Sequence, residues 1–216
     1  MHNLTNFKNR RRWIVFDIEG VLVDGEYLVE LAGRYGVDKV IRRITMKGLM
    51  GEIDWKKGLM LRIGLLSDKM RKDDAEEAAL RLPLMDGAKE TCNRLRRMGF
   101  SIAAISGGFQ FLAERVKKEL KLDLVISNKL LFNDYGRFKG VIIEVDSDKA
   151  SVLMHYLGQQ VVDVAVVDGA NDLTIFNIAE IKIAFNAVPI VESKANISIK
   201  EKNLVKILKY IKPYST

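Results

Sequence analysis

Trp13-Ile-Val-Phe-Asp17-Ile-Glu19-Gly20 is a short apolar run that ends in two carboxylates and a glycine. A continuous apolar run of this length is typical of a strand that is buried on both faces of a parallel sheet. Ligands of open parallel sheets bind outside the carboxyl ends of the strands. We therefore expect Asp17 and Glu19 at the ligand-binding edge of such a sheet.

Similar apolar runs follow at 100–105, 161–167 and 181–185, and helical patterns separate them. This alternation predicts an α/β fold with a doubly wound, mostly parallel sheet. Residues 124–145 are expected to form a β-hairpin flap around the turn Asn133-Asp134-Tyr135-Gly136. The ends of the later runs carry Ser106-Gly107-Gly108 and Asp168-Gly169-Ala170-Asn171-Asp172.

A small helical cap is predicted between the first and second strands. Helical periodicity covers roughly residues 26–35, 38–50, 54–63 and 68–81, with glycines between the segments. We place the cap insert at 24–83 and the core at 13–23 and 84–216. Residues 1–12 form a basic leader, whose order the sequence leaves open.

Composition limits the classes of protein that fit. The chain has 216 residues, 48% of them apolar, with a net charge of +7. Cys92 is the only cysteine, which favours a reducing, cytoplasmic location. No apolar run approaches the length of a membrane span. No aromatic residues alternate with the basic clusters, so we expect no nucleic-acid partner, whereas a homodimer is left open.

The strand ends carry residues that suit phosphate chemistry, although each has an ordinary alternative. Asp17 and Glu19 could act as nucleophile and acid, or simply cap a helix. Ser106 and Gly107 could seat an anion, or form a plain turn. The carboxylates and amide of 168–172 suit Mg²⁺. Lys149 on its own is best interpreted as a surface lysine.

Asp17, Ser106, Lys149 and Asp168 follow one another as the four motifs of the haloacid dehalogenase superfamily do, and the chain resembles it from about Trp13 to Ile211. The phosphoserine phosphatase family is the most similar group within it. The resemblance implies that Asp17 is the nucleophile, Glu19 the acid and base, and Mg²⁺ the cofactor. It assigns the metal to Asp17, Asp168 and the Glu19 carbonyl, the phosphoryl group to Ser106, Gly107 and Lys149, and completes the site with Asn171 and Asp172.

The resemblance extends into the cap and implies a small phosphorylated amino acid as substrate, namely O-phospho-L-serine in serine biosynthesis. Glu26 corresponds to the carboxylate that receives the substrate ammonium, and Arg62 to the guanidinium that binds its carboxylate. A planar guanidinium suits a carboxylate. Leu49 and Trp55 correspond to the apolar residues, usually Met and Phe, that close over the substrate. The ordinary alternative for Glu26 and Arg62 is a solvated cap surface.

Several positions depart from the family pattern. Glu19 stands where most members have Asp, and Gly20-Val21 stands in place of Ser-Thr. Val167 replaces a glycine, and Val188 replaces a lysine. Both valines could change the rim of the pocket, and the sequence leaves the effect of Glu19 and Val167 on the rate open.

Two other functions remain open. One is a related phosphatase or phosphotransferase for another small phosphomonoester, for example transfer from phosphoserine to homoserine. The other is a non-catalytic, basic protein that associates with nucleic acid, which is disfavoured because every catalytic position holds a competent residue.

Overall fold

The computed structural model describes residues 10–158 and 161–213. Its described strands form one sheet of seven, in the order β4-β3-β2-β1-β5-β6-β7. All neighbours are parallel except β3 and β4, which form the expected hairpin. Their bounds are β1 Trp13–Phe16, β2 Ser101–Phe109, β3 Leu124–Phe132, β4 Phe138–Ile142, β5 Val162–Val167, β6 Ala179–Phe185 and β7 Ile197–Ile199. The predicted α/β, doubly wound architecture is confirmed.

Strand β1 lies in the middle of the sheet, and all four of its residues are buried. Ile14 and Phe16 pack into the core on one face of the sheet, whereas Trp13 and Val15 pack into the core on the other. Alternate side chains of a strand point to opposite faces, so each face of β1 contributes to one core. This explains why the apolar run is continuous rather than alternating.

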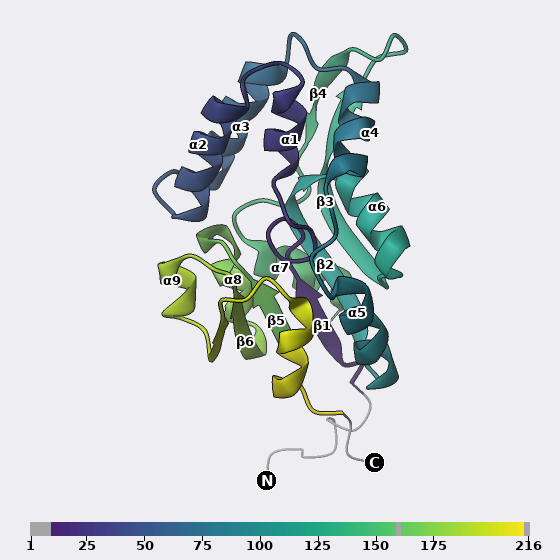
Figure 1. Ribbon diagram of the computed structural model, residues 1–216, viewed down its shortest axis with the longest axis vertical. Coiled ribbons are helices and arrows are strands. Elements are labelled where there is room, and N and C mark those ends of the chain that lie inside the picture. The colour runs from purple at the N-terminus through teal and green to yellow at the C-terminus, as the bar shows by residue number, and fades with distance from the viewer. Residues whose placement is uncertain (1–9, 159–160, 214–216) are drawn as a thin grey trace.

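Five described helices lie between β1 and β2, and the first four match the four helical segments that the sequence predicts: α1 Tyr27–Gly33, α2 Asp38–Leu49, α3 Trp55–Leu66 and α4 Lys72–Arg81. These four occupy the upper part of the molecule in Figure 1, with α2 and α3 side by side. The hairpin contacts this region, because the Lys72 amide donates to the Gly136 carbonyl at 2.9 Å. The division of the chain into a cap at 24–83 and a core stays a prediction.

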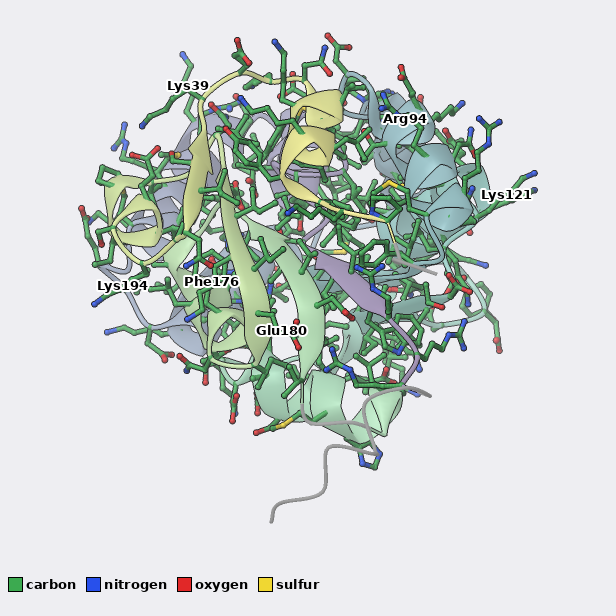
Figure 2. The ribbon with its side chains drawn as sticks, turned by 90° about the horizontal axis from the view of Figure 1, so that it is seen from below. Lys39, Arg94, Lys121, Phe176, Glu180 and Lys194 are labelled. Atoms are coloured by element: carbon green, nitrogen blue, oxygen red, sulfur yellow. The ribbon has the colours of Figure 1, made fainter. Side chains whose placement is uncertain are left out.

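The remaining helices flank the sheet. They are α5 Ala88–Arg97, α6 Gln110–Leu120, α7 Lys149–Leu157, α8 Leu173–Phe176 and α9 Pro189–Glu192, together with the 3-10 helices η2 Ala170–Asp172 and η3 Leu204–Tyr210. Figure 2 shows Lys39, Lys121 and Lys194 at the edge of the molecule, pointing away from it, whereas Phe176 is buried. Much of the positive charge is therefore solvated. No helix within 10–158 or 161–213 is long and apolar enough to cross a membrane.

Two details differ from the sequence-based expectations. Strand β2 continues to Phe109, so the Ser106-Gly107-Gly108 segment belongs to the strand end itself. The short strand β7 was not expected, because three residues are too few to show periodicity. Residues 1–9 of the basic leader lie outside the described residues, whereas Arg10 and Arg12 form ion pairs with Asp163 at the start of β5.

Candidate active site

Ten predicted catalytic and substrate-binding residues line one pocket at the carboxyl ends of the central strands. The pocket has an empty volume of about 610 Å³, which includes the space where it opens to solvent. The ten are Asp17, Glu19, Glu26, Leu49, Trp55, Arg62, Ser106, Gly107, Lys149 and Asn171. They come together because β2, β1 and β5 are neighbours in the sheet, and because α2 and α3 supply the opposite wall.

Lys149 is not a surface lysine, because its side chain is only 1% exposed. It is the first residue of α7, which the Asp148 carboxylate caps. Its Nζ donates to Asp17 Oδ1 at 2.9 Å and also donates to Asp172 Oδ1. Burial alone would lower the pKa of Lys149, but these two carboxylates raise it above its ordinary value. The lysine therefore stays charged and holds Asp17 in place.

Asp17, Asp168 and Asp172 form a buried carboxylate cluster whose closest oxygens all lie within 4.8 Å of one another. Burial, and then the Asp172 charge, raise the pKa of Asp17 to about 7, while burial and the Asp17 charge raise that of Asp168 well above its ordinary value. Asp168 Oδ1 and Asp172 Oδ2 are buried and accept no hydrogen bond from any residue that the structure describes. Buried oxygens without a donor are costly. A hard divalent cation would satisfy them, so the cluster fits a metal site.

Asp172 was predicted only to support the site, and the structure places its carboxylate inside the cluster.

Gly20 leaves space for the side chain of Asp168. Its φ of +78° is left-handed, and a Cβ there would overlap Asp168 Oδ2. Glycine is the residue that adopts this backbone conformation without strain. The Gly20 that departs from the family pattern therefore accommodates the second predicted metal ligand.

Glu19 joins the core to the start of α1. Its Oε1 accepts a hydrogen bond from the Tyr27 amide at 2.5 Å, and its Oε2 lies 3.4 Å from the Ser106 hydroxyl. Burial raises the pKa of Glu19, although the Tyr27 amide opposes the shift. A carboxyl group with a raised pKa carries a proton at higher pH than usual, which suits a general acid.

The anion seat at the end of β2 is held from behind by Asn128, which the sequence analysis missed. The Asn128 amide is fully buried and donates to the Gly107 carbonyl at 2.9 Å. Its Oδ1 accepts from the Glu144 and Val145 amides at 2.9 Å each. A buried amide within the apolar pattern of β3 was the available signal, because buried polar groups need partners.

Arg62 and Glu26 lie at the cap side of the pocket without pairing to each other. Arg62 donates from Nε to the Gly58 carbonyl and from Nη1 to Thr45 Oγ1, both at 3.2 Å, and it forms no ion pair with any described residue. Burial lowers the pKa of Arg62, and Glu19 and Glu26 counteract this. Burial and then Glu19 raise the pKa of Glu26 well above its ordinary value. Both side chains are half-buried and line the pocket, so they are not freely solvated surface residues.

Leu49 and Trp55 bring the cap helices against the end of β2 and the turn that follows β5. A Cβ at Gly107 would lie 2.5 Å from the Trp55 indole Nε1, and one at Gly169 would lie 2.7 Å from Leu49 Cδ2. Glycine at both positions thus permits close contact between cap and core. Asn171 completes this wall and donates to Asp172 Oδ1 at 3.3 Å.

The two valine departures do not lie where the sequence analysis expected. Val167 is fully buried in β5 and packs in the core. Val188 directly precedes α9, and its amide donates to the Asp168 carbonyl at 3.0 Å. Neither lines the pocket. The expected change at the pocket rim is therefore wrong.

Three features meet at the strand ends of this doubly wound sheet: a carboxylate held by a buried lysine, an anion seat, and a carboxylate cluster that fits a metal. Together they define a phosphoryl-transfer enzyme with a capped pocket. Residues 12–177 match the model of the haloacid dehalogenase-like hydrolases, and the chain belongs to this family. It is a phosphoric monoester hydrolase.

The phosphoserine phosphatase of Methanocaldococcus jannaschii is 34% identical over 212 residues, which cover 95% of this chain and all of that protein. That of Wolinella succinogenes is 36% identical over 204 residues, covering 91% of this chain and 98% of that one. Among solved structures, a phospho-aspartyl intermediate analogue of phosphoserine phosphatase has a TM-score of 0.88 at 33% identity and covers 94% of this chain and all of that one. A substrate-bound phosphoserine phosphatase complex has a TM-score of 0.88 at 32% identity, with 95% and 100% covered.

Proposed function

We propose that this chain hydrolyses O-phospho-L-serine to L-serine and phosphate, with Mg²⁺ as cofactor and Asp17 as a covalent nucleophile. One observation supports this choice of substrate. Glu26 and Arg62 both lie on the cap side of the pocket that Asp17 also lines, and they do not pair with each other. Both side chains are only partly exposed. A largely desolvated carboxylate and guanidinium that form no ion pair are costly unless a ligand neutralises them. An α-amino acid brings an ammonium to one and a carboxylate to the other. The relatives are named for this substrate, and that supports the proposal.

In the first step, an oxygen of Asp17 bonds to phosphorus while the bond from phosphorus to the serine oxygen breaks. Glu19 gives its proton to the leaving alkoxide, which departs as the serine hydroxyl. Ser106 and the Gly107 amide hold the phosphoryl oxygens, and Lys149 keeps the Asp17 carboxylate oriented through its 2.9 Å contact. Catalysis of this kind depends mainly on position and on the stabilisation of charge.

In the second step, Glu19 takes a proton from water, the water oxygen bonds to phosphorus, and the bond to Asp17 breaks to release phosphate. Mg²⁺, when bound at Asp17, Asp168 and the Glu19 carbonyl, would neutralise charge that develops on the phosphoryl oxygens. Asp172 lies in the same carboxylate cluster and supports this placement.

The test is phosphate release from phosphoserine, phosphothreonine, phosphoethanolamine and a sugar phosphate in the presence of Mg²⁺. We expect phosphoserine to have the highest kcat/KM. Acid quenching after incubation with ³²P-labelled phosphoserine should leave the label on Asp17, and the Asp17→Asn protein is the control. Product formation without any label on Asp17 would contradict the mechanism, and an equal rate on all substrates would contradict the assigned substrate. Product that forms only when homoserine is added would indicate a phosphotransferase.

A further inference from the structure

Thr45 occupies an unusual position in the cap. Of the twelve residues of α2, only Ile41 and Thr45 are buried. Thr45 is 5% exposed and lines the same pocket as Glu26 and Arg62. An apolar side chain would pack equally well at a buried helix position, so a hydroxyl here needs a hydrogen-bond partner to be neutral in energy.

The hydroxyl of Thr45 has one partner, on the neighbouring helix. Its Oγ1 accepts a hydrogen bond from Arg62 Nη1 at 3.2 Å. A hydroxyl group can accept and donate at once. A threonine within a helix often donates to the carbonyl four residues earlier. Thr45 donates neither to Ile41 nor to any other acceptor in the described part of the chain, so its proton remains for a ligand.

Arg62 is arranged to share a ligand with this hydroxyl. The contacts to the Gly58 carbonyl and to Thr45 use two of the five N–H groups of the guanidinium. These contacts fix the plane of the guanidinium from α2 and from α3 itself. Arg62 and Thr45 both line the pocket, so the other N–H groups of the guanidinium and the hydroxyl proton are available to the same ligand.

From this geometry we propose that Thr45 is a second carboxylate-binding residue, and that its hydroxyl donates to the substrate carboxylate beside Arg62. The proposal rests on the proposed function, because it assigns a place to the carboxylate of phosphoserine. It gives Thr45 two tasks in one hydrogen-bond chain: it positions Arg62, and it selects for substrates that carry a carboxylate.

The experiment compares phosphoserine with phosphoethanolamine, which keeps the phosphate and the amine but lacks the carboxylate. Thr45→Val removes the hydroxyl and keeps the shape of the side chain. A hydrogen bond to a charged group is strong, so we expect kcat/KM for phosphoserine to fall about tenfold or more, chiefly through KM. The loss on phosphoethanolamine should be several times smaller. Thr45→Ser restores the hydroxyl and should recover most of the phosphoserine activity.

Thr91 provides a matched control, because it is a fully buried threonine on α5, away from the pocket lining. Thr91→Val should leave the ratio of the two substrates at its wild-type value. Melting temperatures identify a Thr45 variant that is merely unfolded, and Thr45→Ala replaces Thr45→Val in that case.

The outcomes separate this inference from the proposed function. A wild-type protein that does not prefer phosphoserine overturns both. If the wild-type protein prefers phosphoserine and the Thr45 variants keep that preference, only the role of Thr45 is overturned. Equal losses on the two substrates, or no recovery in Thr45→Ser, also overturn the role, because they indicate that Thr45 only joins two helices.

Discussion

Replacing Gly20 with alanine tests the placement of Asp168 without reference to any substrate. Gly20 has a φ of +78°, and its added Cβ would overlap Asp168 Oδ2 and lie 2.9 Å from Asp168 Cγ. The left-handed conformation costs alanine about 1–2 kcal/mol. Moving the buried carboxylate aside adds about 1–2 kcal/mol, which is in the range for overpacking. We therefore expect Gly20→Ala to lower the free energy of unfolding by roughly 2–4 kcal/mol.

The matched control is Gly99→Ala, because Gly99 has a φ of +84° and its Cβ would meet no described atom within 4 Å. The free energy of unfolding of that variant should fall only by the cost of the left-handed backbone conformation, about 1–2 kcal/mol. Urea unfolding with and without Mg²⁺ measures both losses. At a hundred times its dissociation constant, Mg²⁺ should stabilise the wild type and Gly99→Ala by about 2.7 kcal/mol.

Gly20→Ala should show little of this stabilisation, since the displaced carboxylate no longer faces Asp17. Its kcat/KM should fall about 100-fold, as expected for a reacting group misplaced by about 1 Å. A Gly20→Ala protein that keeps both the stabilisation by Mg²⁺ and the activity would refute the assignment of Asp168 as a metal ligand.

Three further predictions follow from the site. Asp17→Asn should abolish turnover of every substrate, measured as phosphate release, because an amide is a poor nucleophile. Arg62→Ala should lower kcat/KM for phosphoserine by about 10–100-fold, the loss of a charged hydrogen bond, but affect an aryl phosphate only slightly; equal losses would contradict its role. Burial raises the pKa of Asp17 to about 7, so the metal-free folded state binds more protons than the unfolded state. Its free energy of unfolding should therefore fall as pH rises from about 4 to about 7, and Mg²⁺ should reduce that slope in urea titrations; a rise would contradict the burial of this carboxyl group.

The sequence predicts those features that depend on neighbouring residues. The apolar run before Asp17 specifies a buried strand, and its acidic end specifies the ligand-binding edge. The order of Asp17, Ser106, Lys149 and Asp168 then adds the family resemblance. It points to ten residues that line one pocket, although Lys149 alone suggests a surface residue, and their roles stay predictions. The cap boundaries, the basic leader, the cytoplasmic location, the absence of nucleic acid and a homodimer stay predictions.

Contacts between distant segments could not be predicted in this way. Asn128 holds the Gly107 carbonyl across 21 positions of sequence, and this requires the register of β2 and β3. The Thr45 contact with Arg62 depends on how α2 and α3 pack against each other. Glu19 reaches the Tyr27 amide because of the exact path of the loop between β1 and α1. Each of these contacts depends on how separate segments pack together. The sequence pattern of a single segment does not specify that packing.

The balance of charge in the pocket explains why selectivity should be high. Among the residues that the structure describes, five acidic ones line the pocket or form the carboxylate cluster, whereas only Lys149 and Arg62 bring positive charge to the pocket lining. Lys149 pairs with Asp17 and Asp172. Asp168 is then available for the proposed metal ion, and Glu26 for the proposed substrate ammonium. A phosphate ester without an amino acid group would leave the half-buried Glu26 and Arg62 without partners of opposite charge. Sites built around polar groups reject ligands that cannot pair them far more strongly than apolar pockets reject a missing methylene. Substrate choice is therefore expected to come from the cost of charges left without a partner, and the cap residues set that cost.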